Sequence, residues 1–328
     1  MTENYYQTKL EESGLLMQTK LTHEDYMNEL LSFQELLGSI VINDGESHRT
    51  DEIIVDLERI ARAKHVEKDP QFRKGVAALR QINKEISISI AGKHGEDRVA
   101  RTLEYITRPC CKYRNIYISD GDRETELDNL ILTENGLIIL EVKNVKTDIT
   151  IAENGRILYD NLCYHDISMC DKMQDKRDLL QAEIESRMSE DGLSFPVSID
   201  SYIVLSTQRG VRIKVNDLCK KEKFCFRASL PYIIDAYQTE NKLTDEQMMY
   251  LDSIINEMET KKKCFDVKLD FDQVRADLAG ALAVCMDDVT NDDALEQVVE
   301  SKESKDAPIV SLRVYRWKRF MQIGAVVM

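Results

Sequence analysis

The stretch 124-ETELDNLILTENGLIILEVKNV-145 places Asp128, Glu141 and Lys143 inside runs of Leu, Ile and Val. Two alternating apolar runs joined by Asn135-Gly136 predict a β-hairpin, because Asn-Gly favours a tight two-residue turn. That turn sets Asp128 directly opposite Lys143 and places Glu141 diagonal to Asp128, so all three charges share one face. The same face carries Leu130, Leu132 and Ile139, and the opposite face carries Ile131, Ile138, Leu140 and Val142. A sheet that is apolar on both faces is expected to be covered on both.

Charge in such surroundings is costly unless it is paired or bound to a metal ion. Two neighbouring carboxylates suit a hard cation such as Mg²⁺, which also accepts phosphate oxygen as a ligand. An adjacent ammonium can hold the attacking water and offset the charge that develops during hydrolysis. Asp128, Glu141 and Lys143 therefore predict metal-assisted phosphodiester hydrolysis, although Asp128 opposite Lys143 is also compatible with a plain salt bridge.

Composition sets limits on the kind of protein. The 328 residues contain no apolar run long enough to span a membrane, and the start of the chain is polar and acidic. The eight cysteines are scattered without zinc-finger spacing, which favours reduced thiols and a cytosolic location. The net charge of −15 argues against nucleic acid as a partner, but residues 93–114 and 209–227 are locally basic.

Residues 1–90 are predicted to be helical. The predicted helix starts are Thr22, Thr50 and Asp69, the last followed by Pro70. Gly92 and Gly95 are expected to break the third helix, so that a new helix covers 92–106. These N-terminal helices are expected to serve packing, homo-oligomerisation or the binding of a protein partner.

The following pattern predicts three strands, a helix and another strand, an order typical of an α/β fold. The strands are expected at 115–119, 126–133, 136–144 and 201–206, with a hairpin at 148–159 closed by Asn154-Gly155, helices at 171–188 and 244–263, and a basic strand-like end at 311–320. The chain is thus divided into a helical N-terminal region (1–90), a core (91–235), and a C-terminal helix, acidic segment and basic tail (236–328).

Two stretches carry a resemblance to a known family. The segments 92-GKHGEDRVARTLEYI-106 and 126-ELDNLILTENGLIILEVKN-144 resemble the nuclease-related domain (NERD) family, a branch of the PD-(D/E)xK restriction-endonuclease-like superfamily. The likeness rests on a G-x-x-G-E helix start, an E-L-D strand and a G-x-x-x-L-E-x-K strand, and covers about residues 90–207. It implies a restriction-endonuclease-like core, a mixed sheet flanked by helices.

The resemblance also implies the site. Its acidic metal ligands would be Glu96, Asp128 and Glu141, with Lys143 as the catalytic lysine. Gln174 is similar to a glutamine that the family carries on the next helix, although Cys170-Asp171 stands where the family has Asn-Pro, and Gln181 is a rival. The implied cofactor is Mg²⁺, for which Mn²⁺ would substitute. DNA is the favoured partner, and RNA is also compatible.

The prediction is a cytosolic, prokaryotic, Mg²⁺-dependent nuclease without membrane contact, acting in DNA processing or in defence against foreign DNA. Lys93, Arg98 and Arg101 are candidates for phosphate contact, and His94 and His165 for a proton shuttle. Each has a plain alternative as part of a solvated helix face or a structural loop. The alternative function is a non-cleaving module that binds nucleic acid or protein within a larger complex.

Overall fold

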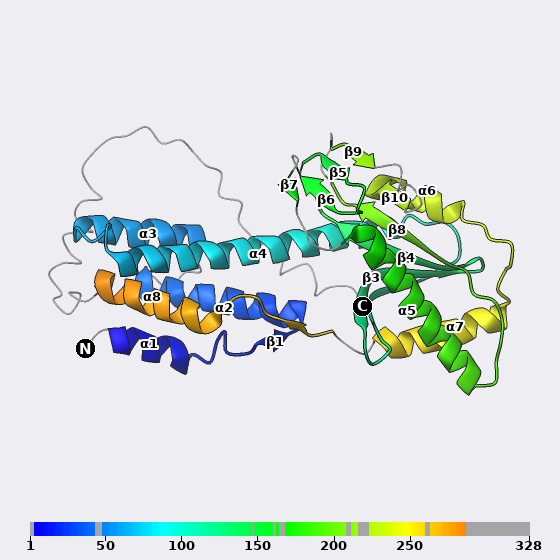
Figure 1. Ribbon diagram of the computed structural model, residues 1–328, viewed down its shortest axis with the longest axis horizontal. Helices are drawn as coiled ribbons and strands as arrows, with labels where there is room; N and C mark the ends of the chain where they lie inside the picture. The colour runs from blue at the N-terminus through cyan, green and yellow to red at the C-terminus, as the bar shows by residue number, and fades with distance from the viewer. Residues whose placement is uncertain are drawn as a thin grey trace, which may run out of the picture.

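The computed structural model describes residues 3–42, 48–145, 147–159, 162–163, 168–207, 211–215, 223–259 and 263–286. They form an elongated helical part and an α/β core, and one long helix runs from the first into the second (Figure 1). The predicted strand at 311–320 and His165 lie outside these residues. Within the described ranges, no helix combines the length and the apolarity needed to cross a bilayer.

The helical part joins the two ends of the described chain. It contains α1 (Glu3–Glu12), α2 (His23–Val41), α3 (Thr50–Ala63), most of α4 (Pro70–Leu103) and α8 (Phe271–Met286). The predicted starts are confirmed: Thr22 caps α2 by accepting from the Asp25 N–H, and Asp69 caps α4 just before Pro70. The late helix α8 packs against α1 and α4, so residues from both ends build one apolar core.

Helix α4 corrects one prediction, because it continues through both Gly92 and Gly95 and so crosses the expected boundary at residue 90. A β-carbon on Gly92 would meet nothing within 4 Å, whereas one on Gly95 would lie 2.8 Å from the Asn144 Cβ. Gly95 is therefore required by the close passage of α4 over a strand end and does not break the helix. The Asn144 Nδ2 donates to the Ala91 carbonyl at 2.6 Å and fixes this crossing.

A five-stranded mixed sheet forms the centre of the core, in the order β10-β8-β4-β3-β2. Its strands are β2 (Cys111–Ser119), β3 (Glu124–Thr133), β4 (Gly136–Lys143), β8 (Ile199–Leu205) and β10 (Lys223–Phe226). The first three are antiparallel, and β8 pairs in parallel with both β4 and β10. A mixed sheet flanked by helices confirms the predicted α/β class and is consistent with a restriction-endonuclease-like core.

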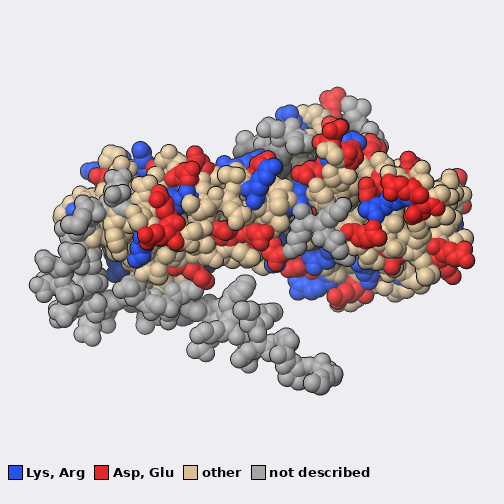
Figure 2. Space-filling view, turned by 90° about the horizontal axis from the view of Figure 1, so that it is seen from below, with Lys and Arg blue, Asp and Glu red and all other residues tan. Residues whose placement is uncertain are grey.

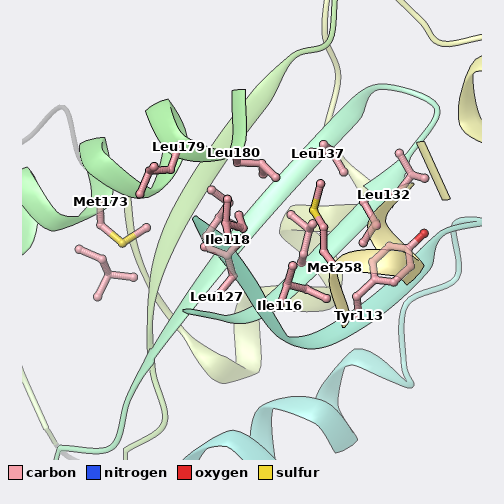
Figure 3. Close-up of a cluster of buried hydrophobic side chains, with 14 of the residues drawn as sticks. Tyr113, Ile116, Ile118, Leu127, Leu132, Leu137, Met173, Leu179, Leu180 and Met258 are labelled. Atoms are coloured by element: carbon pink, nitrogen blue, oxygen red, sulfur yellow. The ribbon is translucent and has the colours of Figure 1, made fainter. Parts of the chain in front are cut away.

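Both faces of the sheet are covered, as the two apolar faces predict. One face carries Leu130, Leu132 and Ile139 against α5 (Met169–Glu190) and α7 (Asp245–Glu259), in the core that Figure 3 shows. The other carries Ile131, Ile138, Leu140 and Val142 against the end of α4, the turn η2 (Arg227–Ser229) and α6 (Leu230–Asp235). The face assignment from the sequence is therefore confirmed.

The register of the hairpin is not the predicted one. Thr133 pairs with Gly136, so the turn consists of Glu134 and Asn135 and the partners move by two positions. The cause lies around the turn: the Thr133 Oγ1 accepts from the Asn135 N–H at 3.1 Å, and the Thr239 Oγ1 donates to the Asn135 carbonyl at 2.9 Å. Gly136, at φ +112°, enters the ladder instead of closing the turn. A shift of two keeps every side chain on its predicted face.

Two smaller sheets complete the fold. One consists of β5 (Ile149–Ile151), β6 (Ile157–Tyr159), β7 (Leu162–Cys163) and β9 (Ile213–Val215), and its β5–β6 hairpin confirms the predicted turn at Asn154-Gly155. The other pairs β1 (Lys20–Leu21) with β11 (Phe265–Asp266), and so ties the helical part to the chain that leaves the core. Helix α7 begins with a capping box, since Thr244 and Gln247 bond each other's backbone N–H.

Candidate active site

Asp128 and Glu141 are the centre of the site. The ladder pairs Asn129 with Leu140, and the next position along it brings Asp128 opposite Glu141. The predicted pairing of Asp128 with Lys143 is therefore wrong, and its cause is the two-residue shift at the turn. The Asp128 Oδ2 accepts the Val142 N–H at 2.6 Å, which fixes this carboxylate to the edge of β4.

Three ammonium groups converge on the Glu141 carboxylate. The Lys143 Nζ lies 2.7 Å from its Oε1 and the Lys172 Nζ lies 3.1 Å from the same oxygen. The Lys176 Nζ contacts the Oε2 and also donates to the Glu126 carbonyl at 2.6 Å. Burial opposes ionisation of Glu141, but the charges of Lys176, Lys143 and Lys172 hold its pKa well below the ordinary value.

The pKa values of the neighbouring acids are shifted upward, in the opposite direction to that of Glu141. Burial and the nearby Glu141 raise the pKa of Asp128, and burial together with Asp128 raises that of Glu126. Burial and Asp128 raise the pKa of Glu96 to about 7. Carboxyl groups from α4, β3 and β4 thus repel one another across a small region. An added cation would reduce this repulsion.

Helix α4 delivers Glu96 to this region. The close contact between Gly95 and Asn144 holds α4 against the end of β4, and Glu96 follows directly. Of the candidates for phosphate contact on the same helix, Lys93 and Arg101 are exposed and Arg98 is partly buried. The Arg101 Nε donates to the Asp97 carbonyl at 3.2 Å, and contact of any of the three with nucleic acid stays a prediction.

Helix α5 corrects the prediction about glutamine. Gln174 is exposed and bonds Asp178 and Arg177 on its own helix, while Gln181 bonds Glu185 in the same way. Neither side chain joins the acidic cluster. Their places are taken by two residues that the sequence interpretation missed, Lys172 and Lys176.

A signal for Lys176 was present in the sequence. The buried face of α5 consists of Met169, Cys170, Met173, Lys176, Leu179, Leu180, Ile184 and Met188. Lys176 stands in the middle of this apolar stripe, and its side chain is only 2% exposed. A lysine at such a position needs a buried anion as partner, and the hairpin supplies acids set among apolar residues.

The donor set fits a hard cation in chemistry, since Asp128, Glu96 and Glu141 offer carboxylate oxygens whose mutual repulsion a divalent ion would offset. Among the described residues, however, no three acidic, histidine or cysteine side chains lie close enough together to hold a metal ion. Both oxygens of Glu141 contact lysines. Binding of a metal by Glu141 would therefore require these ammonium groups to move aside.

The fold is a mixed α/β core in which acids from a helix and two strands lie beside a strand lysine. Residues 91–206, about a third of the chain, match the family model described as the nuclease-related domain (NERD). All members of the cluster described above lie within this segment, which confirms the resemblance noted from the motifs. The chain therefore contains a segment that is similar to the nuclease-related domain. No match was found among curated proteins or among solved structures.

Proposed function

We propose that the protein is a metal-dependent nuclease that hydrolyses phosphodiester bonds, with DNA as the favoured substrate. The observation that carries this proposal is the grouping of Glu96, Asp128 and Glu141 with Lys143 in the NERD segment. Mg²⁺ or Mn²⁺, when bound, would polarise the phosphate and favour deprotonation of the attacking water. The predicted cytosolic location, homo-oligomerisation and role in DNA processing or defence stay predictions.

The residues would divide the work as follows. Asp128 and Glu141 would supply the carboxylate oxygens for the cation, and Glu96 would complete or orient its ligand shell. The Lys143 side chain is 27% exposed, so its ammonium can hold a water molecule once a cation takes its place at the Glu141 Oε1. Lys172, which is 43% exposed, can offset negative charge on a phosphate. Lys176 is buried and would act through Glu141, by holding it ionised.

The test is cleavage of linear and circular, single- and double-stranded DNA, and of RNA, with Mg²⁺, Mn²⁺ or EDTA. Asp128→Ala and Lys143→Ala should each lower the cleavage rate by about 100-fold or more, as loss of a group that stabilises developing charge does. Gln174→Ala is the matched control, because it alters the same region without touching the cluster. Wild-type cleavage by the Lys143→Ala variant would refute the proposed roles.

The alternative is a non-cleaving nucleic-acid or protein-binding module. It is favoured by one observation, that both Glu141 oxygens are occupied by lysines. A folded wild type that cuts none of these substrates with either metal, yet binds nucleic acid with a steep dependence on salt, would support this second function.

A further inference from the structure

Two side chains from outside the NERD segment reach the acidic end of the core. The β1–β11 ladder pairs Leu21 with Phe265, and the Val267 N–H donates to the Thr19 carbonyl at 2.9 Å. This small sheet fixes the start of α2 beside the chain that runs from α7 to α8 (Figure 1). The helical part is therefore attached to the core through this ladder as well as through α4.

His23, the first residue of α2, stands at this attachment. Its ring stacks on Phe265 with centroids 4.4 Å apart and planes inclined by 25°, while the side chain keeps solvent access. Desolvation by the neighbouring protein lowers the pKa of His23, Asp128 raises it, and Lys172 and Lys263 lower it further. The imidazole thus lies within the electrostatic reach of both an acid and a lysine of the candidate site.

Lys263 reaches the same place from the other side of the ladder. Its Nζ donates to the Glu124 carbonyl at 3.0 Å and lies 3.8 Å from the Glu124 Oε1, at the start of β3. Its charge partly offsets the rise in the pKa of Glu126, a residue two positions closer to Asp128. The Lys263 side chain is 29% exposed, and an ammonium has three donors, so it can accept a further anionic partner.

We infer that His23 and Lys263 contact the phosphate backbone of the nucleic-acid substrate beside the bond that is cut. This inference rests on the proposed function. The acids of the site repel a polyanion, and Lys143, Lys172 and Lys176 are all directed at Glu141. His23 and Lys263 add N–H donors near the cluster, and Figure 2 shows Lys and Arg side chains interspersed with Asp and Glu near the junction of the two parts.

The experiment measures equilibrium binding of fluorescently labelled DNA and RNA oligonucleotides by anisotropy in EDTA, over a range of salt concentrations. Lys263→Ala should raise Kd about tenfold and lower the slope of log K against log salt by about one. His23→Phe keeps a ring on Phe265 but removes the ring N–H, and should raise Kd about fivefold. Lys20→Ala is the control from the same small sheet, and should stay within about twofold of the wild type.

The outcomes separate the two proposals. Wild-type Kd values and salt slopes in both His23→Phe and Lys263→Ala, with thermal melting unchanged, would overturn the inference even if the enzyme cleaves. Loss of binding in these variants, with no cleavage by the wild type in Mg²⁺, would support the phosphate contact by His23 and Lys263 and refute the nuclease. A wild type that binds neither oligonucleotide in EDTA would overturn the inference, and the cleavage assay with Mg²⁺ or Mn²⁺ would then decide the nuclease by itself.

Discussion

Two buried charges, one in each part of the molecule, have different surroundings. Arg275 of α8 is 5% exposed, and its guanidinium contacts the Leu16 carbonyl and Asp272, an acid on its own helix that is 91% exposed. Glu141 is 1% exposed and contacts three lysines, and the acids around it have raised pKa values. The Arg275 guanidinium holds the loop that contains Leu16 in place. The charges around Glu141 are coupled across four elements and leave the neighbouring acids under mutual repulsion, which is typical of a functional site.

The largest expected effect comes from removing Lys176, the buried partner of Glu141. Lys176→Met should lower the free energy of unfolding by about 3 kcal/mol, because it withdraws the most buried counter-charge from a buried carboxylate. Urea denaturation measures this loss. The double variant with Glu141→Gln should lose less than the sum of the two single variants, because the partners are coupled. Additive losses would show that the pair is not coupled, and would place Glu141 in the same class as Arg275.

Next in size is the effect of pH through Glu96. Because its pKa is raised to about 7, the folded state holds this proton more tightly than the unfolded state. The resulting stabilisation is complete below the ordinary pKa of 4.5 and is lost as the pH rises through about 7. Between pH 5 and 8 the unfolding free energy of the wild type should therefore fall by about 2–3 kcal/mol relative to that of Glu96→Gln. Chemical denaturation of both proteins across this range measures the difference.

The same pair of proteins tests the cation. Added Mg²⁺ at pH 8 should raise the melting temperature of the wild type more than that of Glu96→Gln, because only the wild type carries the charge that the cation relieves. Equal shifts in the two proteins would mean that Glu96 takes no part in metal binding. If the unfolding free energies of the two proteins changed with pH in the same way without Mg²⁺, Glu96 would not be one of the acids whose pKa is raised.

A smaller effect is expected at Arg275, the other side of the comparison. Arg275→Met should cost about 1–2 kcal/mol of unfolding free energy, because the Leu16 carbonyl loses its donor, and nuclease activity should stay unchanged. Leu16 is buried at φ +55°, so the loop depends on such a contact. A change in cleavage without a loss of stability would show that the two buried charges are not separate in function.

The sequence predicted the sheet, its two covered faces and the helix caps, because these depend on side-chain periodicity and on local hydrogen bonds. It failed where a distant contact decided the outcome. Thr239 and the Thr133 hydroxyl moved the hairpin turn by one residue, and the fit of Gly95 against Asn144 kept α4 unbroken. A shift of two residues kept Asp128 on its face but replaced its cross-strand neighbour, so the face of the hairpin that carries the charges was predictable and their pairing was not.

The smallest expected effect distinguishes two residues on one turn of α5. Gln174→Ala should change stability by less than about 0.5 kcal/mol and leave the cleavage rate within about twofold, because its partners are Asp178 and Arg177 on the exposed face. Lys172→Ala should leave the protein folded, since the side chain is 43% exposed, but should slow cleavage about tenfold or more by removing a charge that offsets negative charge on the phosphate. Initial rates of the two variants under identical metal and salt conditions measure the contrast. A larger loss in Gln174→Ala than in Lys172→Ala would mean that α5 turns its glutamine toward the acids when substrate binds. In that case Gln174 would belong to the site, as the resemblance to the family implies.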